Sequence, residues 1–465
     1  MRDLVVVGAG SAGMSAAIAS RRMGLSVIIV DENATLGGQV YRSVGASPVR
    51  NPAILGRDYW AGKALVDAAI SADIEHLNSA AVWMIEREDD ASFSVGVSQA
   101  GQSRMMNARA VLIATGALER PFPIQGWTLP GVMTAGAGQS LLKTSGLVPD
   151  GPLVLAGTGP LLYLLAAQYS RAGVSIDALL DTTPRSNWRV AMKHLPAFLF
   201  SPYCHKGLRL LMEVERATRL VRGVTALRAL GDTALQEVAF VQRGRERRIA
   251  AQTLMLHQGV VPQVNLSMAA GCEHRWDDAR LAFEPVLSDL GATSVPGIFI
   301  AGDSAGIGGA VAAEISGGLA ALGVALHLRR IAEVDGRAVA HRRELAEALR
   351  GRRFLDALYR PAPSFRLPSD DVIICRCEEI TAGAVRQVAL AGAPGPNQAK
   401  TFLRAGMGLC QGRLCGVTVT EIMSEATRRV PSDIGHYRLR NPVKPLTLGE
   451  LASACTKRSK ALRLD

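Results

Sequence analysis

The chain has 465 residues, a length typical of about three domains. Its 48% hydrophobic and 20% charged residues exclude disordered and collagen-like proteins. Lys and Arg number 52 and Asp and Glu 41, so the net charge of +11 suits an acidic partner, a nucleic acid or an anionic cofactor. The N-terminus shows no signal peptide, and no uninterrupted apolar run reaches the ~18 residues of a membrane span. We therefore expect a cytoplasmic protein.

The first predicted unit is a βαβ dinucleotide-binding motif. A strand at Leu4–Val7, a helix at Ala12–Arg22 and a strand at Leu25–Val30 surround the sequence Gly8-Ala-Gly-Ser-Ala-Gly13. In this G-x-G-x-x-G pattern the first glycine allows a tight turn, the second admits a pyrophosphate and the third lets the helix pack on the strand. Asp31 follows the second strand, where an acid accepts hydrogen bonds from a ribose.

Three later segments are predicted to reach the same nucleotide. Leu36-Gly-Gly-Gln39 follows the acid, Ala114-Thr-Gly116 ends a β-branched strand, and Gly302-Asp303 ends the apolar strand Gly297–Ala301. Convergence of distant segments implies an extended ligand, and these residues alone leave FAD and NAD as the candidates. A second strand–glycine–helix–strand unit, Leu153–Leu180, separates these segments. The first module is therefore predicted to be split around the second.

This arrangement, over about residues 1–325, resembles the two-dinucleotide-domain flavoproteins, which are similar to glutathione reductase and thioredoxin reductase. The resemblance implies an α/β fold with two dinucleotide-binding domains and FAD at the first site. No cysteine stands near Gly38 or within residues 134–139, which excludes disulfide reductase activity because dithiol exchange needs a sulfur nucleophile. The implied FAD-binding residues are Gly8, Gly10, Ser11, Ala12, Gly13, Asp31, Glu32, Gly38, Gln39, Val82, Ala114, Thr115, Gly116, Gly302, Asp303, Gly309 and Ala310.

The second unit carries the glycine pattern with altered side chains. In Gly157-Thr-Gly-Pro-Leu-Leu162 a leucine replaces the third glycine, which should push helix and strand apart or change the phosphate path. Leu164 stands where related NAD(P)H-dependent flavoproteins commonly have glutamate. These departures argue against NAD(P)H and leave an empty remnant or another nucleotide. Arg185 is interpreted as a surface arginine rather than a phosphate ligand.

The segment Trp188–Leu220 alternates apolar and basic residues. Its helical spacing favours local core, and the alternative is a partner-docking surface, where Met, aromatic residues and Arg are enriched. Cys204 and Cys272 are interpreted as structural thiols. No zinc site is predicted, because His205, His257 and His274 lack a ligand-spaced companion, and no paired general acid and base is evident.

An arginine-rich arm follows. Residues 329–366 hold ten arginines and five acids. Because aromatic residues are almost absent, a nucleic-acid stacking platform is not expected, and the arm is interpreted as a solvated or docking segment. Pro361-Ala-Pro363 and Pro368-Ser369 mark a linker.

Four cysteines distinguish the last segment. Cys375-x-Cys377 and Cys410-x4-Cys415 suit tetrahedral zinc or an iron–sulfur cluster, and both spacings fall outside the two to four residues that zinc knuckles favour. A [2Fe–2S] core needs two thiolates per iron and carries net negative charge, so nearby donors and helix N-termini stabilise it. Thr381 and Asn397 are predicted N-caps. Lys400, Arg404 and Arg413 add positive charge.

The cysteine segment resembles the bacterioferritin-associated-ferredoxin-type [2Fe–2S] domain, with Cys375, Cys377, Cys410 and Cys415 as the implied ligands. The C-x4-C spacing is similar to the version fused to the α subunits of opine oxidase, hydrogen cyanide synthase and D-hydroxyproline dehydrogenase. The other similar stretches are Ala114–Pro121, Gly126–Val132, Gly271–Trp276 and Arg440–Pro445.

That resemblance implies an electron-transfer α subunit carrying FAD and [2Fe–2S]. An FAD-containing β subunit would oxidise an opine, D-hydroxyproline or glycine-type amine, with FMN at the interface between the two as a further expectation. Peripheral association with a membrane through the electron acceptor and a further small subunit are also expected; no nucleic acid is. The alternatives are a self-contained NAD(P)H-dependent flavin/[2Fe–2S] reductase and a non-catalytic assembly subunit. We predict an FAD domain at 1–148 and 285–328, a second dinucleotide-binding-like domain at 149–284, an arm and linker at 329–369, and a [2Fe–2S] domain at 370–465.

Overall fold

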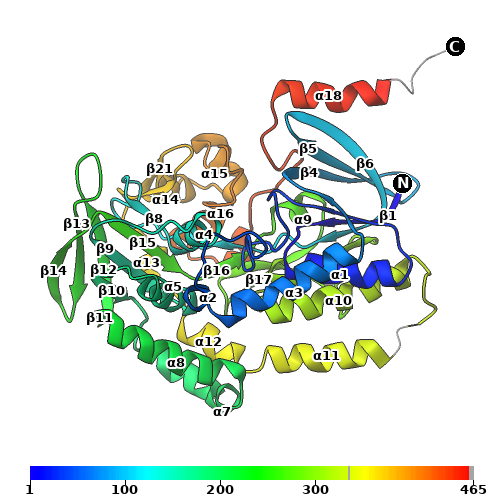
Figure 1. The fold of residues 1–465 in the computed structure, drawn as a ribbon. Coiled ribbons are helices and arrows are strands. Elements are labelled where there is room, and N and C mark those ends of the chain that lie inside the picture. Colours follow the sequence, from blue (N-terminus) through cyan, green and yellow to red (C-terminus); the bar gives the residue numbers. More distant parts are fainter. Residues whose placement is uncertain (334–335, 460–465) are drawn as a thin grey trace.

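Figure 1 shows the fold in a computed structural model, which describes residues 1–333 and 336–459. The chain forms two α/β modules that share one long cleft. An arm of helices runs beneath both modules, and a small helical unit carries the four cysteines.

The first module is built on a seven-stranded sheet whose centre is parallel. Val6 of β1 pairs with Ile29 of β2 and with Leu112 of β6. Strands covered on both faces read as unbroken apolar runs, and the middle of β1 is fully buried. The late strand β19 pairs with β6, so strands from both sides of the second module lie in this sheet. The strands are β3 (Glu75–Leu77), β2 (Val27–Val30), β1 (Arg2–Val7), β6 (Gln102–Ile113), β5 (Phe93–Gln99), β4 (Ala80–Arg87) and β19 (Ile298–Ile300).

Helices α1 (Ser11–Arg22) and α10 (Ala310–His327) cross closely on this sheet. A Cβ at Gly317 of α10 would lie 2.2 Å from the carbonyl oxygen of Ala12, so only glycine allows this approach. By length and apolar composition α10 could span a membrane, but 61% of it is buried inside the protein. The outer helices are α2 (Pro52–Leu55) and α3 (Arg57–Ser71).

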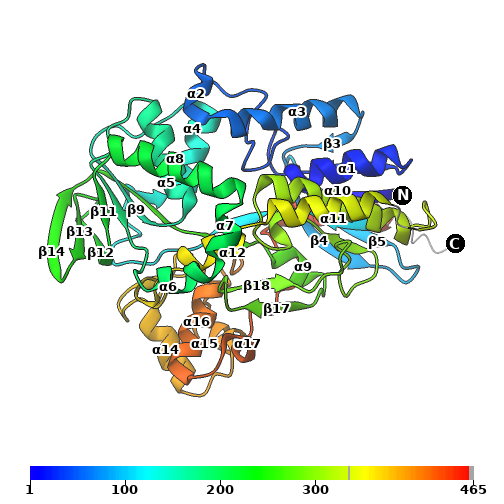
Figure 2. The same ribbon diagram turned by 90° about the horizontal axis from the view of Figure 1, so that it is seen from below.

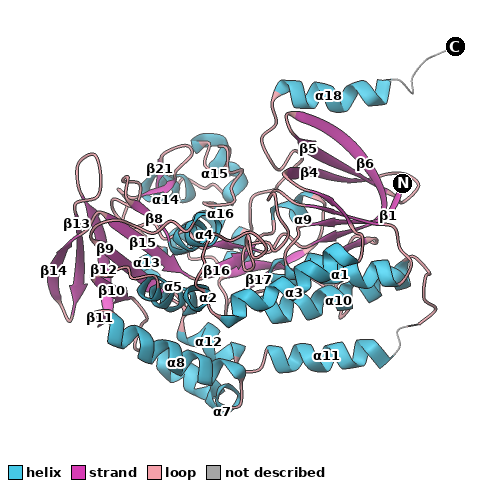
Figure 3. Cartoon of the chain, viewed as in Figure 1, coloured by secondary structure: helices cyan, strands magenta, loops and turns pink. Residues whose placement is uncertain are grey.

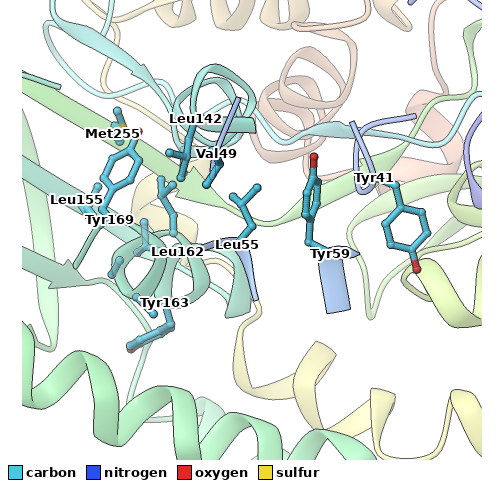
Figure 4. Close-up of a cluster of buried hydrophobic side chains, with 14 of the residues drawn as sticks. Tyr41, Val49, Leu55, Tyr59, Leu142, Leu155, Leu162, Tyr163, Tyr169 and Met255 are labelled. Carbon is cyan, nitrogen blue, oxygen red and sulfur yellow. Dashed lines mark hydrogen bonds between the residues drawn. The ribbon is translucent and has the colours of Figure 1, made fainter. Parts of the chain in front are cut away.

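The second module has a five-stranded parallel sheet with an antiparallel three-stranded sheet beside it. Leu162 of helix α5 (Pro160–Arg171) is fully buried in the core (Figure 4). It belongs to the same core cluster as Leu153 and Leu155 of β9. The strands are β11 (Leu220–Arg222), β10 (Ala178–Asp181), β9 (Leu153–Thr158), β15 (Thr253–Gln258) and β8 (Val132–Thr134), then β12 (Val224–Leu230), β13 (Glu237–Gln242) and β14 (Arg245–Ala250).

The segment Trp188–Leu220, interpreted from the sequence as local core or as a docking surface, lies among the helices of the second module. Phe198 stacks on Phe354 of the arm, with 4.1 Å between ring centroids. Trp188, Phe200 and Met212 are at least half exposed, so the structure divides this segment between the two interpretations. The helices are α4 (Ala135–Ser145), α5 (Pro160–Arg171), α6 (Asn187–Ala191), η1 (Met192–His194), α7 (Leu195–Leu199) and α8 (Pro202–Ala217).

Short elements connect the modules, and the arm packs across both (Figure 2). Helix α12 contacts α6 and α7, and Phe354 and Leu358 are buried there. The connecting elements are β7 (Ala117–Glu119) with β16 (Val260–Pro262), α9 (Asn265–Ala269), β17 (His274–Asp277) with β18 (Ala282–Pro285), and η2 (Gly302–Ser304). The arm comprises α11 (Gly336–Ala348), α12 (Arg352–Leu358) and α13 (Pro363–Arg366).

The cysteine unit is a small cluster of helices behind a two-stranded ribbon. The Thr381 hydroxyl accepts a hydrogen bond from the Ala384 N–H, which confirms the predicted cap. The prediction for Asn397 is wrong: Pro396, lacking an N–H, takes the first helical position, and the Asn397 side chain accepts from the Arg438 N–H instead. The elements are β20 (Ile373–Cys375), β21 (Ile380–Thr381), α14 (Ala382–Leu390), α15 (Pro396–Leu403), α16 (Gly416–Thr427) and α17 (Pro431–Ile434).

The chain then returns to the first module (Figure 3). The Val443 N–H donates to the Trp83 carbonyl at 2.9 Å, and helix α18 (Leu448–Ser459) packs on β6. The segment predicted as one domain, 370–465, therefore contributes both to the cysteine unit and, through its tail and α18, to the first module. Its last six residues lie outside the described part of the chain.

Candidate functional site

The two modules enclose a cleft of about 2810 Å³. Small-molecule sites usually measure roughly 300–1,000 Å³, so this cleft has room for an extended ligand. All the residues predicted to bind FAD line it, except Gly13. A Cβ at Gly13 would lie 1.9 Å from the Gly8 carbonyl oxygen, so Gly13 acts in helix packing rather than at the wall.

The glycine turn at the cleft wall is shaped for close approach. Gly8 has φ +108°, and a Cβ there would lie 2.4 Å from the Ala114 carbonyl oxygen. At Gly10 the nearest protein atom is the Gly38 Cα, 3.9 Å from a Cβ position, so this side of the turn is open. Helix α1 begins at Ser11 and presents its free N–H groups there. The turn therefore fits a pyrophosphate.

Two carboxylates hold the loops of this site. Asp31 accepts from the Ala9 N–H at 2.6 Å and from the Asn33 N–H at 2.7 Å. Asp303 accepts from the N–H groups of Gly308 and Gly309, both at 2.9 Å, and so fixes the entry to α10. Both acids keep backbone amides oriented around the cleft, in addition to any contact with a ribose or ribityl chain.

Lys143 is a cleft residue that the sequence did not reveal. Its ammonium donates to the carbonyls of Gln39 and Val40 at 3.1 and 3.0 Å and to Gln139 at 2.9 Å. Burial lowers its pKa to about 8. This side chain pins the predicted loop around Gln39 to α4 of the other module. A lysine late in a helix gives no sequence signal for such a role.

The structure also forms an acid–histidine pair, contrary to the sequence expectation that none exists. His257 Nδ1 lies 2.5 Å from Glu119 Oε1, and Glu119 also accepts from the Gly136 N–H at 2.9 Å. Glu119 lines the cleft, whereas His257 is buried behind it. The two residues are 138 positions apart, which is why spacing could not reveal them.

The second nucleotide position is covered by the chain itself. Asp181 ends β10, where an acid would face a ribose, but it accepts from the Tyr163 hydroxyl at 3.0 Å and from the Thr183 N–H at 2.8 Å. Tyr359, after α12, lies 6.5 Å from Tyr163 between ring centroids. Arg185 lines only a separate cavity of about 380 Å³ nearby. These contacts argue against a dinucleotide at this position.

The fold brings the four predicted cysteine ligands together. Cys415 hydrogen-bonds Cys375, which lowers the pKa of Cys375 to about 6, and it lowers that of Cys410 to about 5 in the same way. Cys377 also bonds Cys410. Cys375 and Cys415 are buried, and Cys377 is exposed. Thiolates are the form that binds metal, so the lowered pKa values of Cys375 and Cys410 suit a ligand set. Hydrogen bonds to Cys375 and Cys410 raise the pKa of Cys415, and burial raises the pKa of Cys377.

Glycines let the backbone pack closely around the cysteines. A Cβ at Gly408 would lie 2.3 Å from Cys377 Cβ, and Cβ atoms at Gly406 and Gly412 would meet the Tyr437 ring at 2.6 and 2.8 Å. A [2Fe–2S] cluster takes two thiolates at each iron, and Cys375, Cys377, Cys410 and Cys415 supply that number.

The cysteine loop touches the cleft. The Asn265 amide, on the cleft wall, donates to the Gln411 carbonyl at 3.0 Å. Arg413 also lines the cleft and donates to the Val443 carbonyl at 3.5 Å. Lys444, next in the chain, lines the cleft and pairs with Glu32. The predicted flavin and cluster sites therefore share a wall made of the C-x4-C loop and the returning tail.

A buried ion network fastens the cysteine unit to the modules. Glu421 of α16 lies 3.7 Å from the Arg120 guanidinium and pairs with Arg366 of the arm. Arg120 also donates to the carbonyls of Arg280 and Leu281 at 2.8 and 2.7 Å. Both Glu421 and Arg120 are about 5% exposed or less.

Glu421→Ala is expected to destabilise the protein by about 3–5 kcal/mol, because the buried Arg120 and the partly buried Arg366 lose their counter-ion. Glu425→Ala is the matched control: Glu425 lies four residues on in the same helix and its half-exposed carboxylate pairs with Arg386, so a loss of at most about 1 kcal/mol is expected. Urea unfolding of both variants measures the difference. Equal midpoints would contradict the anchoring role of Glu421.

The sequence and the fold of this chain are similar to those of known flavoproteins and iron–sulfur proteins. Residues 2–317 match the pyridine nucleotide-disulphide oxidoreductase family, and residues 373–425 match the BFD-like [2Fe-2S] binding domain. The opine oxidase A subunit of Agrobacterium tumefaciens (strain Ach5) is 48% identical, over 97% of this chain and 91% of that protein. Hydrogen cyanide synthase subunit HcnB of Pseudomonas aeruginosa is 34% identical, over 95% and 96%. The crystal structure of L-proline dehydrogenase from P. horikoshii has a TM-score of 0.72 at 19% identity, over 97% of this chain and 79% of that one.

Proposed function

The chain belongs to the flavoprotein family of hydrogen cyanide synthase subunit HcnB and the opine oxidase A subunit, whose fold carries FAD and a [2Fe–2S] cluster. From this family membership we propose that the chain is the electron-transfer subunit of a heteromeric amine dehydrogenase. The substrate class is an amino acid or secondary amine of the opine, D-hydroxyproline or glycine type. FAD exchanges electrons in pairs or singly, and a [2Fe–2S] cluster exchanges one at a time.

The observation that carries this proposal is the wall shared by the cleft and the C-x4-C loop. Asn265 and Arg413 hold the loop against the cleft through hydrogen bonds to main-chain carbonyls. The backbone turn at Gly8–Gly13 is proposed to bind the FAD pyrophosphate, and Asp31 and Asp303 to orient the surrounding amides. The four cysteines are proposed to hold the cluster on the other side of the wall.

The amine is proposed to be oxidised on a partner subunit with its own FAD. The named relatives are subunits of multi-subunit enzymes, which supports the existence of a partner. An FMN between the subunits and a further small subunit belong to the same proposal. The proposed location is the cytoplasm, with contact to a membrane only through the final electron acceptor. Six cysteines in the described part of the chain are free thiols, which suits this location.

The test is amine dehydrogenation by the purified chain with and without a co-expressed amine-oxidising FAD subunit. D-octopine, nopaline, D-hydroxyproline and glycine are supplied with a dye acceptor. Turnover is expected only for the reconstituted pair. Robust turnover by the chain alone would overturn the proposal.

A self-contained NAD(P)H-dependent reductase is the competing function, and we expect it to fail. Because the Tyr163 hydroxyl and the Thr183 N–H already occupy the Asp181 carboxylate, NADH and NADPH should reduce the bound flavin at least about a hundredfold more slowly than dithionite does. Stopped-flow absorbance at the flavin band measures this. Rapid bleaching by either nucleotide would favour the reductase instead.

A further inference from the structure

A buried tyrosine lies beside the proposed cluster ligands. Tyr437 follows helix α17, which packs against α16 (Figure 2). The residue is 3% exposed, and its hydroxyl oxygen lies 3.9 Å from the Cys415 sulfur, within hydrogen-bond reach for sulfur. A buried tyrosine hydroxyl usually has a hydrogen-bond partner. The partner of this one is the sulfur of a proposed iron ligand.

The tyrosine ring is held in place from several sides. Gly406 and Gly412 of the cysteine loop pack on it, and a Cβ at Gly406 would lie 3.0 Å from the hydroxyl oxygen. The His436 ring meets the Tyr437 ring edge-on, with 5.7 Å between centroids. This packing fixes the position of the hydroxyl oxygen beside Cys415. Because the side chain is already ordered, little conformational entropy is lost when its hydrogen bond forms.

The four cysteines have different hydrogen-bond donors. Backbone N–H groups donate to three of the sulfurs. These donors are Glu378 and Gly406 for Cys375, Cys410 for Cys377, and Gly412 and Leu414 for Cys410. Cys415 takes none of these N–H groups. It hydrogen-bonds the thiols of Cys375 and Cys410 and the Tyr437 hydroxyl.

Metal binding changes the hydrogen bonds of Cys415. A bond between two thiols needs a proton on sulfur, and ligand cysteines lose that proton when they bind metal. The Tyr437 hydroxyl keeps its proton at neutral pH, because the ordinary pKa of a tyrosine is about 10. A thiolate can only accept a hydrogen bond. In the metal-bound form Tyr437 is therefore the donor, and the bonds from Cys375 and Cys410 are lost.

We propose that Tyr437 acts on the [2Fe–2S] cluster through Cys415, and that the hydrogen bond from its hydroxyl raises the midpoint potential of the cluster. In each reduction the flavin loses one electron and the cluster gains it, so the cluster becomes more negative. A donor at a ligand sulfur stabilises the more negative state, and hydrogen bonds to the sulfurs are among the factors that set such potentials. Tyr437 is thus a positioning residue that favours electron flow toward the cluster. The inference rests on the proposed binding of the cluster by the four cysteines.

The test is a redox titration of the holo chain and of its Tyr437→Phe variant. Phenylalanine keeps the ring between Gly406 and Gly412 and removes only the hydroxyl. The equilibrium constant for one-electron reduction of the cluster is expected to fall about tenfold, which lowers the midpoint potential by about 59 mV. Anaerobic titration with mediators, followed by the EPR signal of the reduced cluster, measures this shift separately from the flavin. The iron content and the flavin potential should match those of the parent.

Tyr169→Phe is the matched control. Tyr169 is fully buried in the second module, and its hydroxyl also contacts a sulfur, 3.7 Å away at Met255 Sδ. Both residues belong to the core cluster drawn in Figure 4, which contains none of the four cysteines. The variant loses a buried hydroxyl that contacts sulfur, as Tyr437→Phe does. Its cluster potential is expected to equal that of the parent.

Two further measurements act on the same hydroxyl. 3-Fluorotyrosine placed at position 437 has a more acidic hydroxyl and nearly the same size, so this stronger donor should raise the midpoint potential. After exchange into D2O, pulsed electron–nuclear double resonance of the reduced parent should show a coupled deuteron that the Tyr437→Phe variant lacks. These two effects report on the hydrogen bond itself rather than on the packing of the ring.

An unchanged cluster potential in Tyr437→Phe at full iron content would overturn the inference, and so would an equal shift in Tyr169→Phe. If Tyr437→Phe loses its iron, the fluorinated chain decides, and an unchanged potential there also rejects the role of the hydroxyl. A parent chain without iron would instead refute the proposed cluster site. Iron analysis of the parent shows that failure before any variant is compared.

Discussion

A Cys415→Ser variant is expected to be a yellow protein that keeps its FAD and contains no iron. Cys415 is fully buried and hydrogen-bonds both Cys375 and Cys410, so it is central to the ligand set. A serine hydroxyl stays protonated at neutral pH and cannot replace a thiolate. Iron and acid-labile sulfide should fall from about two per chain to background. Colorimetric iron analysis and the visible spectrum measure both cofactors in one sample.

Cys204→Ser is the control for this experiment. Cys204 lies in α8, partly exposed and away from the other described cysteines, so iron and flavin should both be retained. Full iron content in Cys415→Ser would show that the four cysteines do not form the cluster site. The proposed binding of FAD would stand regardless, since the cleft is made by other elements.

Gly10→Val is expected to give a folded protein that has lost its flavin. Gly10 has extended backbone angles that any residue adopts, and its Cβ position meets no protein atom closer than 3.9 Å. The valine side chain would therefore occupy the space proposed for the pyrophosphate rather than disturb the fold. FAD affinity should fall at least about a hundredfold, measured by fluorescence titration of the apoprotein. Circular dichroism and the iron content should match the parent.

Two further glycine variants distinguish an effect on folding from an effect on flavin binding. Gly8→Val should fail to fold properly, because the position has φ +108° and a Cβ there would collide with the Ala114 carbonyl. Gly45→Val, in a loop with no atom within 4 Å of its Cβ position, should keep its flavin. Flavin retained by Gly10→Val at parental affinity would place the cofactor elsewhere in the cleft.

The elements that could be predicted are those whose signal lies within a few residues. In the turn at Gly8–Gly13, Gly8 has φ +108° and a Cβ at Gly13 would collide with the Gly8 carbonyl oxygen, so only glycine suits these two positions. The cap at Thr381 satisfies N–H groups one turn away. Asn397 shows the limit of this reasoning. Gly395 takes the N-cap position and Pro396 the first helical position, so the helix begins before Asn397.

Both cofactor chemistries were readable from local patterns, because a glycine turn before a helix and four closely spaced thiols act through local geometry and ligand type. How these parts meet follows only from the packing of the whole chain. The Glu119–His257 pair, the contact of Tyr359 with Tyr163 and the hydrogen bond of Asn265 to Gln411 all join residues more than a hundred positions apart. Such contacts are set by how helices and sheets pack, and packing leaves no short-range pattern in the chain.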